Sequence, residues 1–283
     1  MNEGPPALSA EPVTFGRLWA IAGPIRRYVR GFPIHRGKGL LIRRILLPIL
    51  PPDPAVFVAR LPGGGIVHLH PRETLGFATL VYGGFEPAEI SGAIELATPG
   101  TTAFDIGANV GIYSVAMGRA VGRDGMVVAV EPDTTNVSRL RDNLALNGLT
   151  NAEIVEAVAG EHDGIVDLQV ADDPAYHSVV EIERGHAAVG TMAVRSVPLD
   201  RVWEALGRPT VSFVKIDVEG AEPSVLRGAR EMLRFEHPAL LIEAKDEARL
   251  ALLRSELEPL GYRRMARPGF LPWNHLFLRA HPS

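Results

Sequence analysis

The sequence predicts an α/β fold in which a mainly parallel sheet is covered by helices on both faces. The first observation is that short apolar segments alternate with helix-like segments from residue 101 onward. Such alternation is typical of β-α-β units, whose strands run parallel. The second is size and composition: 283 residues, 46% of them hydrophobic and 22% charged, can bury a sizeable core. The third is a glycine turn directly after the first of these strands, where such sheets bind ligands.

Hydrophobic pattern and turn residues give each element of this region an expected range. Strands are expected at 101–106, 126–130, 153–158, 211–216, 239–244, 262–265 and 275–279. Helices are expected at 87–97, 110–121, 134–147, 221–235 and 246–260. Two further strands, 165–170 and 191–197, are expected around a polar insertion, residues 171–187, which could be a loop that binds the acceptor substrate.

Residues 1–72 are expected to form a separate, basic N-terminal region, and residues 73–283 the main domain. Residues 1–12 are rich in Pro and Gly and are expected to be disordered. Prolines divide residues 13–50 into short helices at best. A β-hairpin is predicted for two alternating segments around Pro62-Gly-Gly-Gly65, namely 56–61 and 66–70.

Charge is distributed unevenly along the chain. Residues 1–60 hold nine Lys/Arg and three Asp/Glu, and the remainder holds 20 and 30, for a net charge of −4. The basic segment could make a peripheral contact with an anionic membrane, pack on a partner subunit or cover the active site. Nucleic-acid binding is not expected, because the body is acidic and no cluster of base-stacking aromatic residues accompanies the arginines. The sequence does not predict an oligomeric state.

The expected location is the cytoplasm, with peripheral membrane attachment as the alternative. The chain has no Cys, which excludes disulfides and Cys-ligated zinc and fits a reducing compartment. Its first fifteen residues lack the basic and apolar segments of a secretion signal. The longest apolar run, Ile45–Leu50, is too short to span a bilayer.

The strongest local signal is the segment Phe104-Asp-Ile-Gly-Ala-Asn-Val-Gly-Ile-Tyr-Ser114. An apolar strand ends near Asp105, a tight turn follows at Gly107, and a helix opens near Gly111. A dinucleotide site needs G-x-G-x-x-G, whose second glycine lets the backbone approach a diphosphate. Asn109 stands at that place here and would crowd a diphosphate. S-adenosylmethionine has no phosphate; Asp105 could attract its ammonium, and helix N-terminal amides suit its carboxylate.

A second acid ends the next strand, in Val128-Ala-Val-Glu131-Pro132. Glu131 follows Gly111 by 20 residues, a spacing at which an acid can accept hydrogen bonds from the ribose hydroxyls of an adenosine. Taken singly, Asp105 and Glu131 could be solvated acids beside a glycine turn. Their combination at this spacing favours an adenosyl cofactor.

Three further motifs carry a family resemblance. Glu131-Pro132 is followed by Leu144-Ala-Leu-Asn-Gly148; Val214-Lys-Ile-Asp-Val-Glu-Gly-Ala-Glu222 runs into Val225-Leu-Arg-Gly228; and Tyr82-Gly-Gly-Phe-Glu-Pro87 precedes the glycine loop. Together with the loop 105–114, these motifs make about residues 75–245 resemble the FkbM-type methyltransferase family. The basic N-terminal region has no counterpart in this resemblance.

The resemblance implies a Rossmann-like class I methyltransferase core with seven strands, S-adenosyl-L-methionine as the methyl donor and usually O-methylation. Sugars, glycolipids and natural products are the acceptors associated with the family, so a small-molecule, glycan or lipid acceptor is expected. The expected cofactor-binding residues are Glu86, Asp105, Gly107, Ala108, Asn109, Gly111, Glu131 and Pro132. Glu86 could instead be an acid placed favourably at the N-terminus of its helix.

Lys215, Asp217 and Glu219 are the candidate catalytic residues. They end a strand and face the same rim as Asp105 if the sheet is parallel. An alcohol acceptor must lose its proton, and Asp217 or Glu219 could take it as a general base. The two carboxylates could instead share a divalent cation. Lys215 could instead be a charge partner that holds them. A third interpretation is an acid pair that accepts hydrogen bonds from the amides of the helix starting near Ala221.

Two other functions fit a sheet of this kind. One is a nicotinamide-dependent oxidoreductase, against which Asn109 argues, and the other is a non-catalytic binding module. Four histidines are weaker candidates for a base or metal ligand. His68 and His70 share one face of a strand, His177 lies in the polar insertion, and His275 lies near the last strand. An ordinary surface role is expected for all four.

Overall fold

The computed structural model describes residues 47–48, 50–51, 55–180 and 187–279. By its contacts the chain divides into two compact units, residues 1–59 with 68–85 and residues 60–67 with 86–283. The expected disordered start and nearly all of the expected short helices of residues 13–50 lie outside the described residues.

The predicted N-terminal hairpin is confirmed. β1 (Phe57–Arg60) and β2 (Ile66–Leu69) form a two-stranded sheet. The helix that follows, α3 (Thr74–Tyr82), was not predicted, because its sequence is apolar almost throughout and shows no one-sided pattern. A Cβ at Gly76 would lie 1.9 Å from the carbonyl oxygen of His70, so this helix needs a glycine there.

The larger unit is built on a seven-stranded sheet with the strand order β11-β12-β10-β9-β3-β4-β5. Its strands are β3 (Thr102–Ile106), β4 (Met126–Val130), β5 (Ala152–Val155), β9 (Val211–Ile216), β10 (Ala239–Glu243), β11 (Tyr262–Met265) and β12 (Asn274–Arg279). The pairs β5-β4, β4-β3, β3-β9 and β9-β10 are parallel, and β12 pairs antiparallel with β10 and β11. The predicted mainly parallel, seven-stranded sheet is therefore confirmed.

The strand order reverses between β3 and β9. The chain moves from β3 to β4 and β5 on one side, and from β9 to β10 on the other. β3 and β9 are neighbours, with Asp105 opposite Lys215. Because parallel α/β sheets bind ligands beyond the carboxyl ends of the strands at such a reversal, the loops after Ile106 and Ile216 lie where a ligand site is expected.

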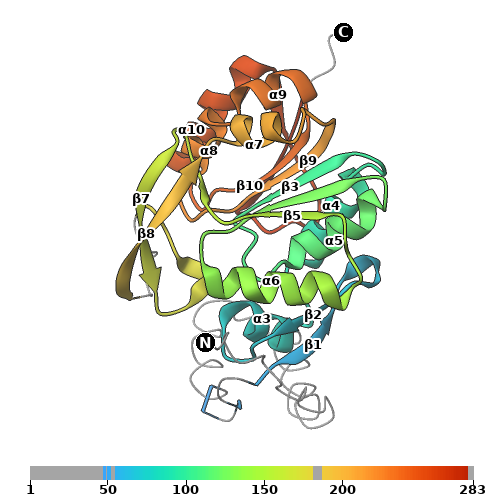
Figure 1. The fold of residues 1–283 in the computed structure, drawn as a ribbon, viewed down its shortest axis with the longest axis vertical. Helices are drawn as coiled ribbons and strands as arrows, with labels where there is room; N and C mark the ends of the chain where they lie inside the picture. Colours follow the sequence, from blue (N-terminus) through green and yellow to red (C-terminus); the bar gives the residue numbers. More distant parts are fainter. Residues whose placement is uncertain (1–46, 49, 52–54, 181–186, 280–283) are drawn as a thin grey trace, which may run out of the picture. The chain divides into compact units, whose positions relative to one another are not determined.

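Helices cover both faces of this sheet, as predicted (Figure 1). One face carries α4 (Pro87–Leu96), α5 (Ile112–Val121) and α6 (Thr134–Leu146), and the other carries α7 (Leu199–Ala205), α8 (Glu222–Arg227), α9 (Arg230–Glu236) and α10 (Glu247–Leu257). Strand side chains alternate between the two faces. Phe104 and Ile106 pack into the core beneath α7 to α10, whereas Asp105 contacts Ser114 of α5 and is buried on the opposite face.

Two predicted elements are divided in the structure. The expected helix 221–235 is broken into α8 and α9 at Gly228, where a Cβ would lie 2.0 Å from the carbonyl oxygen of Gly160. The expected strand 153–158 ends at Val155, and β6 (Val158–Ala159) leaves the main sheet to pair with β8 in a three-stranded sheet. Both breaks depend on contacts made by the segment after β5, which local sequence does not reveal.

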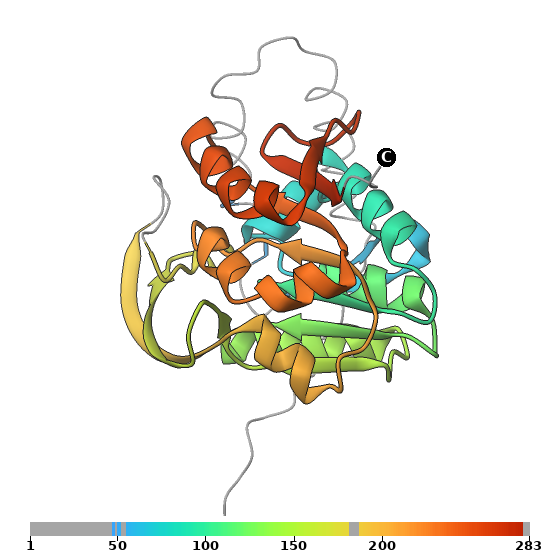
Figure 2. The same ribbon diagram turned by 90° about the horizontal axis from the view of Figure 1, so that it is seen from above.

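The insertion between β5 and β9 is an antiparallel hairpin. β7 (Gly164–Ala171) and β8 (Ala188–Val197) pair along their length, as predicted. Figure 2 shows this hairpin (yellow) at the edge of the unit, beside the main sheet. A short 3-10 turn, η2 (Pro174–Tyr176), lies in the connection between its strands. Among the described residues, no helix combines the length and apolarity needed to cross a bilayer.

Candidate active site

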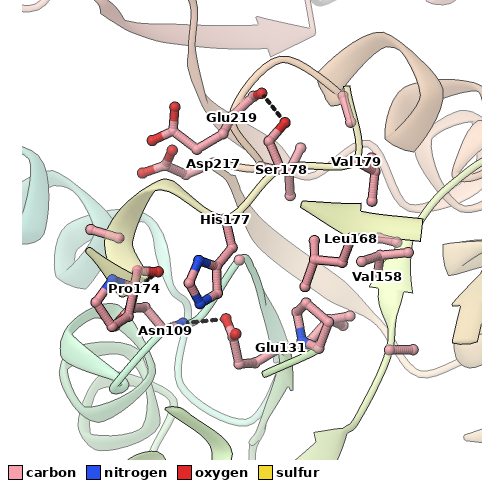
Figure 3. Close-up of a pocket in the computed structure, with 18 residues that line it drawn as sticks. Asn109, Glu131, Val158, Leu168, Pro174, His177, Ser178, Val179, Asp217 and Glu219 are labelled. Carbon is pink, nitrogen blue, oxygen red and sulfur yellow. Dashed lines mark hydrogen bonds between the residues drawn. The ribbon is translucent and has the colours of Figure 1, made fainter. Parts of the chain in front are cut away.

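A pocket opens at the carboxyl ends of the central strands (Figure 3). The space between its walls is about 550 Å³, which includes open solvent. Six predicted site residues line it: Gly107, Asn109, Glu131, Pro132, Asp217 and Glu219. The insertion supplies another wall through Pro174, Ala175, His177, Ser178 and Val179. Four segments that lie far apart in the sequence, 107–109, 130–132, 174–179 and 217–219, therefore meet in one cavity.

Gly107 allows the loops after β3 and β9 to touch. The amide of Asp217 donates to the carbonyl oxygen of Ile106 at 3.0 Å. Gly107 has a φ of +79°, and a Cβ on it would lie 1.9 Å from the carbonyl oxygen of Asp217. Any side chain here would be strained and would also push the two loops apart.

Asn109 connects three parts of the pocket. Its φ is +50°, and its amide donates to Glu131 Oε2 at 2.8 Å. Its side-chain Nδ2 donates to the carbonyl oxygen of Pro174 at 3.3 Å, which ties the loop to the insertion. Ala108 and Gly111 are not among the lining residues; they close the turn through a hydrogen bond from the Gly111 amide to the Ala108 oxygen, 2.8 Å long.

Glu131 is a buried acid that faces the pocket, and most of its hydrogen-bond acceptor positions are occupied. Oε1 accepts from the Asp133 amide at 3.0 Å and from Asn136 Nδ2 at 3.2 Å, and Oε2 accepts from the Asn109 amide at 2.8 Å. A carboxylate offers about four acceptor positions, so one position, on Oε2, is left. Burial raises the pKa of Glu131 to about 7, although these three donors favour the ionised form.

Apolar residues line the pocket on the side of Glu131. They come from the end of β4, from the segment after β5 that includes β6, and from β7: Val130, Pro132, Ala157, Val158 and Leu168. Val130, Ala157 and Leu168 are almost fully buried. This wall suits a flat apolar group rather than a charged one.

Asp105 lies behind the pocket and is not among its lining residues. It is 2% exposed, and its Oδ2 accepts from the hydroxyl of Ser114 at 2.5 Å. Burial raises the pKa of Asp105 to about 6, despite this hydrogen bond and the nearby Lys215. Its negative charge is therefore held close to the glycine loop without direct exposure to the cavity.

Glu86 is likewise buried and outside the lining. Its two carboxylate oxygens accept from the hydroxyl of Tyr113 and from Asn274 Nδ2, each at 2.7 Å. Burial raises its pKa, partly offset by the charge of Lys215. It occupies the N-cap position of α4 with a φ of +41° but makes no side-chain capping bond, so a plain helix cap does not explain it.

The second predicted cluster is larger than the sequence suggested. Lys215 Nζ donates to Asp217 Oδ2 at 2.9 Å, and Lys245 Nζ donates to Glu219 Oε2 at 2.8 Å. Glu243, at the end of β10, joins them: one oxygen from each of Asp217, Glu219 and Glu243 lies within 4.8 Å of the others. Three carboxyl groups and two ammonium groups therefore form one cluster at the rim.

The protonation of this cluster is uneven. Burial favours the neutral form of Asp217. The charge of Lys215 and a hydrogen bond from Glu243 outweigh burial and lower the pKa of Asp217. Burial and the charge of Asp217 raise the pKa of Glu243 to about 10. Burial opposes the charge on Lys215 too, but Asp217 and Glu86 raise the pKa of its ammonium. At neutral pH, Asp217 is thus ionised and Glu243 is protonated and donates to it.

A further acid, Glu222, holds the loop between Asp217 and α8. α8 begins at Glu222, and Glu222 itself accepts from the amides of Val218 at 3.3 Å and Gly220 at 2.9 Å. Glu219 has a φ of +53°, a left-handed conformation that costs energy in a residue with a side chain and often occurs at functional sites.

The four histidines differ in their surroundings. His68 and His70 belong to the smaller unit. His275 is buried, with Nε2 3.2 Å from the carbonyl oxygen of Ala244, and it does not line the pocket. His177 does line the pocket, contrary to the expected surface role. Glu243 and Lys245 were not predicted. The sequence offered one signal for Glu243, since it stands at the end of an apolar strand, as Glu131 does.

A sequence profile of the methyltransferase FkbM domain matches residues 105–264. These residues make up more than half of the chain and include the glycine loop, Glu131 and the whole carboxylate cluster. The chain belongs to the FkbM methyltransferase family. Membership implies S-adenosylmethionine as the methyl donor and an acceptor for the methyl group.

Several solved structures resemble this family member. A methyltransferase FkbM from Methylobacillus flagellatus KT is 18% identical, with a TM-score of 0.45, over 85% of this chain and 59% of that one. A SAM-dependent methyltransferase from Aquifex aeolicus is 17% identical, with a TM-score of 0.41, over 69% and 89%. A SAM-dependent O-methyltransferase from Thermotoga maritima is 14% identical, with a TM-score of 0.41, over 80% and 78%. This chain thus spans 59% of the first structure's length. No curated protein matches the sequence.

Proposed function

We propose that this protein transfers the methyl group of S-adenosylmethionine to a hydroxyl of a sugar, glycolipid or natural-product acceptor. The observation that carries the proposal is that one pocket joins an acid suited to ribose, Glu131, to two carboxylates suited to take a proton, Asp217 and Glu219. These groups lie at the strand reversal, where ligands of such sheets bind.

In this proposal the residues around the pocket would hold the cofactor along its length. The apolar wall would hold its adenine, and the remaining acceptor position of Glu131 would accept from a ribose hydroxyl. The glycine loop and the N-terminal amides of α5, which favour an anion, would hold its carboxylate. The buried charges of Asp105 and Glu86 would attract its ammonium from behind the loop. The carboxylate cluster would then lie beside the sulfonium.

The reaction is an in-line displacement. An acceptor oxygen attacks the methyl carbon, the carbon–sulfur bond breaks with its electron pair remaining on sulfur, and the hydroxyl proton passes to Asp217 or Glu219. Lys215 is the charge partner that keeps Asp217 ionised. Because the sulfonium already activates the methyl group, the enzyme contributes mainly alignment and proton removal.

Divalent cations are not expected to be needed for turnover. Carboxylate oxygens suit a hard cation, but here the charges of Asp217 and Glu219 are matched by Lys215 and Lys245, and Glu243 carries a proton. EDTA should therefore leave the rate of methyl transfer within about twofold of the untreated value. A rate that collapses with EDTA and returns with Mg²⁺ would assign the cluster to metal binding instead.

Cofactor affinity should depend on pH through Glu131. In the neutral acid the proton takes the one acceptor position that the three donors leave. A ribose hydroxyl can donate there only when Glu131 is ionised, so binding must release the proton that Glu131 carries below about pH 7. The Kd for S-adenosylhomocysteine is expected to rise by up to about tenfold per pH unit below that value and to level off above it. Glu131→Gln should bind more weakly and lose this dependence near neutral pH. An equal slope in the wild type and the variant would assign the titration to another group.

The function as a whole is tested with methyl-labelled S-adenosylmethionine. The protein is incubated with extracts separated into glycan, lipid, protein and RNA fractions, and the Asp217→Asn variant serves as the blank. Label in the glycan or lipid fraction is expected. Label in the protein or RNA fraction alone would contradict the proposed acceptor class.

A further inference from the structure

The insertion contributes a segment that lies over the pocket, residues 173–178, which we call the roof segment. Three separate contacts hold it. Asn109 Nδ2 donates to the carbonyl oxygen of Pro174 at 3.3 Å, and Ser178 Oγ donates to the backbone carbonyl oxygen of Glu219 at 2.9 Å. Lys245 Nζ lies 5.6 Å from the ring centroid of Tyr176. The roof segment is therefore fixed to the glycine loop and to the rim of the carboxylate cluster.

Within the roof segment, the ring of His177 is held in one orientation. Its Nδ1 accepts from the amide of Ala171 at 3.1 Å. A nitrogen that accepts a hydrogen bond carries no proton, so in the neutral ring the proton is on Nε2. Burial lowers the pKa of His177, against the charges of Asp133 and Asp173, which favours this neutral form. The side chain is only 9% exposed.

The Nε2 end of the ring faces the cofactor side of the pocket. In Figure 3 the ring of His177 is directed toward Glu131. Nε2 lies 3.8 Å from Asp133 Oδ2, which is longer than an N–H···O hydrogen bond. A donor, His177 Nε2–H, and an acceptor, Glu131 Oε2, are thus presented to the same part of the cavity.

A ribose hydroxyl needs this pair of partners. It donates one hydrogen bond and accepts another, and Glu131 as a carboxylate can only accept. Given that the pocket holds S-adenosylmethionine, as proposed above, we propose that His177 binds the cofactor ribose: Nε2–H donates to a ribose hydroxyl that itself donates to Glu131. Through His177 the insertion would thereby contact the cofactor directly, in addition to forming a wall of the pocket.

Two substitutions separate this role from that of an anchor for the roof segment. His177→Asn keeps an oxygen near the Nδ1 position that can accept from Ala171 but removes the donor at Nε2. His177→Gln places a donor near Nε2 but loses the acceptor for Ala171. By calorimetry, His177→Asn should bind S-adenosylhomocysteine about five- to tenfold more weakly than the wild type, the usual effect of one neutral hydrogen bond. His177→Gln should retain most of the affinity.

The opposite order of affinities would overturn the proposal. If His177→Asn bound S-adenosylhomocysteine like the wild type and His177→Gln bound it weakly, His177 would be only an anchor for the roof segment. Equal affinity of wild type and both variants would also overturn the proposal. If the wild type does not bind S-adenosylhomocysteine at all, the proposed function itself fails.

A second series uses adenosine, 2′-deoxyadenosine and 3′-deoxyadenosine as ligands. The penalty of His177→Asn should vanish for the deoxynucleoside that lacks the contacted hydroxyl; a penalty that persists for both would overturn the ribose assignment.

Discussion

Asp217→Asn is expected to lower kcat by about 10²- to 10⁴-fold, the usual contribution of a general base. Asn cannot take the acceptor's proton. It also removes the charge that Lys215 pairs with at 2.9 Å, which disturbs the neighbouring Glu243 and Glu219 as well. The affinity for S-adenosylhomocysteine should change by no more than about threefold, because the variant affects the chemical step rather than cofactor binding. Initial rates with labelled S-adenosylmethionine, together with calorimetry, measure both quantities.

Two controls make the result interpretable. Asn retains an oxygen that can accept from Lys215, so the variant should still unfold cooperatively in urea. Glu156→Gln makes the corresponding change at a partly exposed carboxylate that pairs with Arg141 and should leave kcat unaltered. If Asp217→Asn turned over at the wild-type rate, Asp217 would be removed from the mechanism and Glu219 would remain as the base.

Gly107→Ala is expected to destabilise the protein by about 3–5 kcal/mol and to abolish cofactor binding. The added Cβ would lie 1.9 Å from the Asp217 oxygen, in a residue whose φ is +79°. Since the obstacle is backbone rather than a flexible side chain, β3 and β9 must separate at their carboxyl ends. Urea unfolding gives the change in the free energy of unfolding, and calorimetry with S-adenosylhomocysteine gives the loss of binding.

Gly100→Ala is the matched control for this substitution. Its φ is +78°, almost the same, but nothing lies within 4 Å of the position of its Cβ. It should therefore lose only about 1–2 kcal/mol, the cost of a side chain in the left-handed region. The difference between the two variants isolates the contact between the loops. Equal losses in both would mean that Gly107 is required only for its backbone conformation.

The parallel sheet could be predicted because its information is local. Each strand is a short apolar segment, and the alternation with helices implies the parallel arrangement. The breaks at Gly228 and Val155 could not be predicted, because they depend on contacts with the segment after β5. α3 was not predicted because its apolar residues are nearly continuous and show no helical period.

The site was partly predictable for a related reason. Glu131 and Asp217 each directly follow a strand, and in a parallel sheet those ends share one rim, so their approach follows from topology. Asp105 lies one residue before the end of β3 and is buried behind the pocket. Glu243 was missed because its strand lies beside β9 only in the assembled sheet order. His177 was given a surface role because nothing in the sequence of a polar insertion shows which wall of a pocket it covers. Its place follows from three long-range contacts of the roof segment.

A crystal structure with S-adenosylhomocysteine bound would show whether this pocket holds the cofactor between Glu131 and the carboxylate cluster. We expect the adenine against Val130, Pro132 and Leu168, a ribose hydroxyl within hydrogen-bond distance of Glu131 Oε2, and the sulfur directed toward Asp217 and Glu219. A ligand bound outside this pocket, or bound with its sulfur pointing away from that carboxylate cluster, would contradict this expectation.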